Sequence, residues 1–185
     1  FFIIFKFSED FLKSKILGLI SILLLEGIYF YNFTTTEFNV NVCQLPFWSL
    51  TVYYCWKSLN SNKTMDWILF GVFAAFGILS KYLFFYLLVA IDIFFIYLIF
   101  KKKFKFNSLI SIASFSIILM PHLLWLINND YTTIRYAFWR TGTIDSNFVD
   151  HIYNPLVFLI KQLGILFPFF IIIFFKTKKF KTKIN

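Results

Sequence analysis

The chain has 185 residues, of which 59% are hydrophobic, 24% are aromatic and only 15% are charged. Soluble domains contain about 45 to 50% apolar and about 25% charged residues. The excess, which includes 29 Phe and 10 Tyr, must face lipid or neighbouring helices. We therefore predict a membrane protein and exclude soluble enzyme folds.

The formal net charge is +9, from 18 basic and 9 acidic residues. Such an excess can indicate a nucleic-acid partner, but in a membrane protein it more often records topology, because cytoplasmic loops are rich in Lys and Arg. The lysines here fall in short segments beside the ends of apolar runs. We therefore expect membrane lipids as partners and no nucleic acid.

Several apolar runs are long enough to cross the hydrocarbon core, which is about 30 Å thick and needs about 18 or more helical residues. These runs are residues 16–36, 38–56, 82–100, 106–129 and 151–175. A further run, residues 67–80, is shorter and would span only about 21 Å. If it crosses separately, all the lysine clusters fall on one side of the membrane, as the positive-inside rule requires.

The predicted fold class is therefore all-α: a polytopic transmembrane bundle of about six spanning helices, with both ends cytoplasmic. We expect residues 1–185 to form a single transmembrane domain, with residues 128–150 as an outer interfacial loop. Because the chain opens on Phe1 and its methionines lie far downstream, we also expect it to be a fragment.

The sequence indicates no metal site or cofactor. Cys43 and Cys55 lie in one expected helix, about 18 Å apart, which is too far for a disulfide. His122 and His151 are widely separated, so no pattern of metal ligands exists.

Lys81 is the most informative single charge, because it follows the short run and should lie below the outer membrane surface. A group at that depth either snorkels to the headgroups or binds an anion such as a lipid phosphate, and both readings stay open. Asp92 and Glu26 lie within apolar runs. We expect each to be a hydrogen-bond partner between helices rather than a reactive group.

The outer segment is predicted to contain an amphipathic helix that lies in the membrane interface. Three of its side chains share a helical face at spacings of three and four, namely Tyr131, Ile134 and Phe138. Arg135 and Arg140 either bind phosphate or anchor the segment together with neighbouring aromatic rings.

Several motifs occur in order along the chain. They are Thr35-Thr36-Glu37-Phe38-Asn39, Leu45-Pro46-Phe47-Trp48-Ser49-Leu50, Asp66-Trp67, Gly71, Gly77-Ile78-Leu79-Ser80-Lys81-Tyr82 and Pro121-His122-Leu123-Leu124-Trp125. Together they resemble the GT-C glycosyltransferases, and more narrowly the family of protein mannosyltransferases and rhizobial lipopolysaccharide galacturonosyltransferases. The resemblance covers roughly residues 17–140.

The resemblance implies an inverting, multi-pass enzyme of the cytoplasmic (inner or plasma) membrane. Such an enzyme transfers a sugar from a polyprenyl-phosphate donor to a lipid, glycan or protein acceptor at the outer face of that membrane. Lys81 matches the motif lysine, which implies donor-phosphate binding. Arg135 and Arg140 match no motif. They are candidates for the same phosphate only because they are basic and are expected on the same side of the membrane. Glu37, Asn39 and His122 are expected to support the outer turn.

The family's catalytic carboxylate lies in an earlier outer loop, as an Asp-Glu pair, and this chain has no counterpart. We therefore assign no catalytic residue and expect an N-terminally truncated chain that is inactive alone. Two other readings remain. A transporter or lipid-linked sugar flippase would use Asp92, Glu26 and Lys81 along a translocation path, whereas in a membrane scaffold the same charges would only serve packing.

Overall fold

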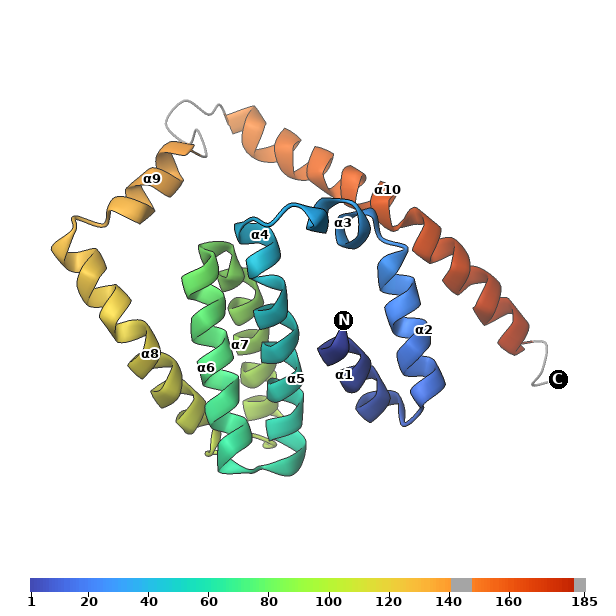
Figure 1. Cartoon of the computed structure of the whole chain (residues 1–185), viewed down its shortest axis with the longest axis horizontal. Coiled ribbons are helices and arrows are strands. Elements are labelled where there is room, and N and C mark those ends of the chain that lie inside the picture. The colour runs from blue at the N-terminus through green and yellow to red at the C-terminus, as the bar shows by residue number, and fades with distance from the viewer. Residues whose placement is uncertain (141–147, 182–185) are drawn as a thin grey trace. The chain divides into compact units, whose positions relative to one another are not determined.

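The computed structural model describes residues 1–140 and 148–181 (Figure 1). In these residues every regular element is helical: α1 (Phe2–Leu12), α2 (Lys15–Glu26), α3 (Tyr29–Asn32), η1 (Thr34–Thr36), α4 (Val40–Cys43), α5 (Leu45–Ser61), α6 (Thr64–Ser80), η2 (Tyr82–Phe84), α7 (Phe85–Phe100), α8 (Ser108–Asn128), α9 (Thr132–Arg140) and α10 (Phe148–Lys181). The predicted class, an all-α membrane bundle, is confirmed.

Two of the predicted spans are present as single apolar segments long enough to cross a membrane. They are Tyr82–Phe100, formed by η2 and α7, and Ser108–Asn128, which is α8. The short run is a separate helix, α6, with 17 residues. The total number of crossings and the orientation of the chain stay predictions.

Two other expected spans do not form continuous helices. The run 16–36 is interrupted after Glu26, where Gly27 separates α2 from the short α3, because glycine is a poor helix former. The run 38–56 is divided at Gln44 between α4 and α5, and Pro46 occupies the first turn of α5, where a missing N–H is tolerated. The expectation that Cys43 and Cys55 share one helix was therefore wrong. Both are free thiols.

By its contacts the chain divides into two units. The first comprises residues 1–19 and 37–130, and the second residues 20–36 and 131–185. In the first unit α6 packs against both α5 and α8. Trp67 and Ala75 of α6 are fully buried there.

The contact of α6 with α8 depends on Gly71. A Cβ at this position would overlap the backbone carbonyl of Ser111. Ser114 reinforces the contact, because its hydroxyl donates to the carbonyl of Ile68 at 3.2 Å. Small residues and hydroxyl bonds of this kind hold helices together in membranes, where the hydrophobic effect does not.

The turn between α5 and α6 is held by a polar network. Asp66 is buried, accepts a hydrogen bond of 2.6 Å from Ser61 and pairs with Lys57 at 3.4 Å. Trp67 Nε1 donates to Asn62 Oδ1 at 3.2 Å. This network holds the N-terminal end of α6 against α5.

Helix α1 packs against α5. Tyr53 of α5 donates a hydrogen bond of 3.2 Å to Asp10, and Trp56 meets the ring of Phe7 edge-on. Lys6 also lies on α1, and its pKa is raised. The main cause is a hydrogen bond to Asp10, and the next is a hydrogen bond to Glu9.

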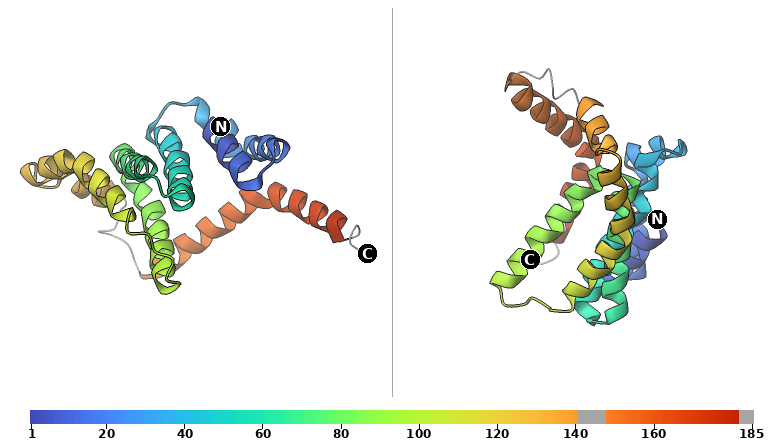
Figure 2. Two further views of the ribbon diagram at one scale, coloured as in Figure 1. Left: turned by 90° about the horizontal axis from the view of Figure 1, so that it is seen from below. Right: turned by 90° about the vertical axis from the view of Figure 1, so that its left-hand side faces the viewer.

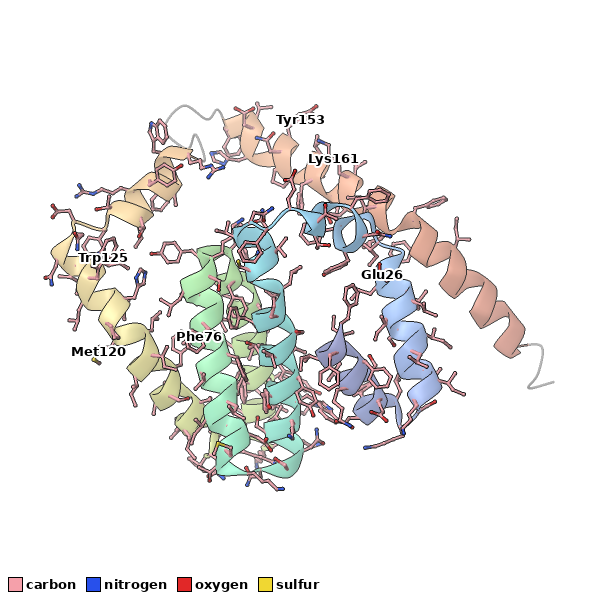
Figure 3. All side chains as sticks on the ribbon, viewed as in Figure 1. Glu26, Phe76, Met120, Trp125, Tyr153 and Lys161 are labelled. Carbon is pink, nitrogen blue, oxygen red and sulfur yellow. The ribbon has the colours of Figure 1, made fainter. Side chains whose placement is uncertain are left out.

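The second unit contains α3, η1, α9 and α10, together with the end of α2. Helix α9 is a short amphipathic helix with rings of Tyr136 and Trp139 6.0 Å apart. Tyr131 was expected on its apolar face, but its positive φ of 55° places it outside the helix. Tyr153 and Lys161 project from the first half of α10 (Figure 3).

Candidate functional site

A tight turn between α6 and α7 positions the candidate site, and Gly77 makes this turn possible. The ring of Phe84, which is 0% exposed, lies where a Cβ at Gly77 would be. The same ring meets Trp48 of α5 edge-on, with centroids 5.6 Å apart. The packing of Phe84 folds η2 back over the end of α6, so that α7 returns in the opposite direction (Figures 1 and 2).

Lys81 lies at the point of reversal. Its backbone is extended (φ −164°, ψ 131°), and its N–H still donates to the carbonyl of Gly77 at 3.1 Å. The side chain is partly buried and its Nζ donates to Oδ1 of Asn41 in α4. In the described part of the chain, no carboxylate lies within ion-pair distance of this ammonium group.

Asn39 acts on Lys81 indirectly. Its Oδ1 caps α4 by accepting from the N–H groups of Asn41 and Val42, at 2.9 and 3.3 Å. Asparagine is among the best residues at this position. The cap orders the short helix that presents the Asn41 side chain to Lys81.

Tyr82 and His122 form a second polar pair. Tyr82 Oη and His122 Nε2 share a hydrogen bond of 2.8 Å between η2 and α8. The imidazole also stacks on Trp125, with centroids 6.0 Å apart and ring planes 12° from parallel. We did not predict Tyr82 as a site residue, although it directly follows Lys81 in the Ser-Lys-Tyr motif.

Because the backbone is extended at Lys81, the side chains of Lys81 and Tyr82 point in different directions. Lys81 reaches α4, whereas Tyr82 reaches α8. The first unit therefore holds a cation and a polar aromatic pair on either side of one short turn.

The remaining predicted residues are less closely tied to this turn. Glu37 is exposed, and its backbone carbonyl accepts from Asn39 Nδ2 at 3.3 Å. Arg135 and Arg140 are exposed on α9, which belongs to the second unit. Their grouping with Lys81 stays a prediction.

Asp92 lines a pocket of about 350 Å³ between α6, α7 and α8. Figure 2 shows that α7 diverges from α6 and α8. Among the described residues that line it, Asp92 is the one with a charge, and Ser108 and Ser111 contribute hydroxyls. The expected partner from another helix is not present among the described residues. Glu26 is exposed at the end of α2, and its backbone carbonyl accepts from Asn32 at 3.4 Å.

In the comparison with protein families, residues 1–125 match the model described as dolichyl-phosphate-mannose-protein mannosyltransferase. The match includes Lys81, Tyr82 and His122 and ends before α9. Among curated proteins and solved structures, no match is found. Because the family model covers more than half of the chain, the chain belongs to the dolichyl-phosphate-mannose-protein mannosyltransferase family, a family of membrane glycosyltransferases.

Proposed function

We propose that this chain forms the donor-binding part of an inverting glycosyltransferase. The enzyme takes a sugar from a polyprenyl-phosphate donor and passes it to a lipid, glycan or protein acceptor at the outer face of the cytoplasmic membrane. The observation that supports this proposal best is Lys81, a partly buried cation without an acidic partner among the described residues, at the end of an apolar helix.

In the proposed reaction, an acceptor hydroxyl attacks the anomeric carbon and the bond to the lipid phosphate breaks. Negative charge then grows on the leaving phosphate. The Lys81 ammonium stabilises that charge, and it does so effectively because it is held in place before the reaction begins. Asn41 holds it through Oδ1, while the amide nitrogen of the same side chain can donate to a phosphate oxygen.

The reaction also requires a carboxylate that orients or deprotonates the acceptor. Glu37 is the acidic residue of the outer turn, and its side chain is exposed. We assign it a supporting role only. No acid-base residue is therefore assigned in this chain, and the proposed role of the chain is to bind the donor phosphate.

Binding of a short prenyl phosphate tests the proposal directly. The chain is placed in phosphatidylcholine nanodiscs and titrated with the prenyl phosphate and with the matching prenol. We expect Lys81→Gln to weaken phosphate binding about tenfold or more, since a hydrogen bond to a charged group is worth about 1.5 to 3 kcal/mol. Lys63→Gln, an exposed lysine at the other end of α6, is the matched control. Equal affinities for phosphate and prenol would contradict the proposal.

A lipid-linked sugar flippase is the alternative, and the pocket beside Asp92 favours it. An ionisable group within an apolar spanning segment often marks a transport path. Proteoliposomes that report movement of a fluorescent prenyl-phosphate sugar between leaflets distinguish the two. Loss of movement in Asp92→Asn, without loss of phosphate binding, would support the flippase.

A further inference from the structure

The cluster of Tyr82, His122 and Trp125 presents polar atoms and aromatic surface together. The hydrogen bond and the ring stacking fix the imidazole from two sides. Trp125 lies near the end of α8 and is 46% exposed, so part of its indole is open to a ligand (Figure 3). All three residues belong to the first unit.

The second ring nitrogen of His122 is available to a ligand. Tyr82 occupies Nε2, and no group in the described residues bonds to Nδ1. If Tyr82 donates its proton to Nε2, Nδ1 carries a hydrogen and donates outward. If Nε2 donates to Tyr82 instead, Nδ1 is an acceptor.

A sugar hydroxyl fits both of these states, because it donates and accepts equally well. A phosphate oxygen fits only the first, because it needs a donor. The C–H faces of a pyranose ring also pack against aromatic rings, whose faces carry partial negative charge. The cluster therefore matches a sugar better than it matches the phosphate that Lys81 would bind.

We propose that His122 and Trp125 contact the sugar ring of the substrate in a subsite separate from the phosphate site at Lys81. Tyr82 is a positioning residue that holds the His122 ring. The proposal rests on the proposed function, since it assigns the sugar and the phosphate of one donor to the two sides of the α6–α7 turn.

Three ligands separate the two sites in sugar-free phosphatidylcholine nanodiscs: a short prenyl phosphate, the same prenyl phosphate bearing a hexose, and an alkyl hexoside without phosphate. We expect the hexose to raise affinity over the bare prenyl phosphate. His122→Ala should remove most of that gain, about tenfold, and leave binding of the bare prenyl phosphate unchanged. Lys81→Gln should weaken both phosphate ligands equally.

The outcomes distinguish the two proposals. If the prenyl phosphate binds through Lys81 but the sugar adds nothing, or its gain survives His122→Ala, the sugar subsite is wrong and the proposed function stands. If no phosphate ligand binds but the hexoside binds through His122, the phosphate assignment fails instead. If the hexoside and the hexose donor both fail to bind, the sugar subsite is overturned.

The role of Tyr82 is tested by nitrogen-15 NMR of histidine in a His151→Gln background, where His122 is the single histidine. Tyr82→Phe should shift the balance between the two tautomers and reduce the sugar-dependent gain, while helicity by circular dichroism stays the same. Tyr86→Phe, an exposed tyrosine on α7, should change neither signal. An unchanged His122 spectrum in Tyr82→Phe would refute the positioning role.

Discussion

The ring of Phe84 lies directly on the backbone of Gly77, and this contact shapes the turn that presents Lys81 to α4 and Tyr82 to α8. A single glycine, whose carbonyl also accepts from the Lys81 N–H, thus shapes the turn that carries two candidate ligand contacts. The spacing of Gly71 and Gly77, which are separated by five residues, has a physical explanation in the same terms. Gly71 admits α8, and Gly77 admits the Phe84 ring.

Gly77→Ala should destabilise the chain and also weaken ligand binding. Its Cβ would overlap the buried Phe84 ring, and overpacking of this kind costs about 1 to 3 kcal/mol. Gly164→Ala is the matched control, because a Cβ there meets nothing within 4 Å and alanine favours a helix. Thermal unfolding in nanodiscs gives the stabilities, and the prenyl-phosphate titration gives the affinities. Equal stabilities for the two variants would show that Phe84 moves aside without cost.

Helix lengths followed from the apolar runs at some positions and not at others. The spans at residues 82–100 and 106–129 and the separate short helix before Lys81 followed from run length and charge alone. The run 16–36 failed because mean hydropathy does not register a helix break, and Gly27 provides one. The N-cap at Asn39 was not predicted, although Asn directly before the start of an apolar helix is a strong signal for a cap.

The partners within the site could not be predicted in the same way. Asn41 and Lys81 are 40 residues apart in sequence, as are Tyr82 and His122. Each pair meets only because α6 packs between neighbouring helices and η2 reverses the chain. Sequence patterns report local periodicity, whereas these contacts depend on how helices pack.

Asp66→Asn should destabilise the turn between α5 and α6. The change removes the ion pair with Lys57 and weakens the short hydrogen bond from Ser61, while Asp66 itself is buried. Disruption of such a buried network costs about 1 to 3 kcal/mol. Glu37→Gln, an exposed acid on the other side of the same unit, should leave stability within about 0.5 kcal/mol of the unmodified chain. Chemical unfolding followed by circular dichroism makes the comparison.

The predicted orientation can be checked with single cysteines in a Cys43→Ser, Cys55→Ser background. A membrane-impermeant maleimide added outside intact cells should label Glu37→Cys, because the outer turn is predicted to face away from the cytoplasm. Lys63→Cys, in the lysine-rich turn at the other end of α6, should be labelled only after the membrane is opened. Labelling of Lys63→Cys in intact cells would reverse the proposed orientation and move the candidate site to the cytoplasmic face.

Arg135 and Arg140 of α9 are grouped with Lys81 by charge and by predicted membrane side alone. If they bind the same phosphate, Arg135→Gln and Arg140→Gln should each weaken binding of the prenyl phosphate in the titration used for Lys81. Combination with Lys81→Gln should then give less than the sum of the single effects, because groups that share one ligand do not act independently. If the arginines only anchor α9 at the membrane surface, prenyl-phosphate affinity should stay constant. Binding of α9 to anionic vesicles should weaken instead in the Arg→Gln variants. Each Lys or Arg beside an anionic lipid surface contributes about 1 kcal/mol to that attraction.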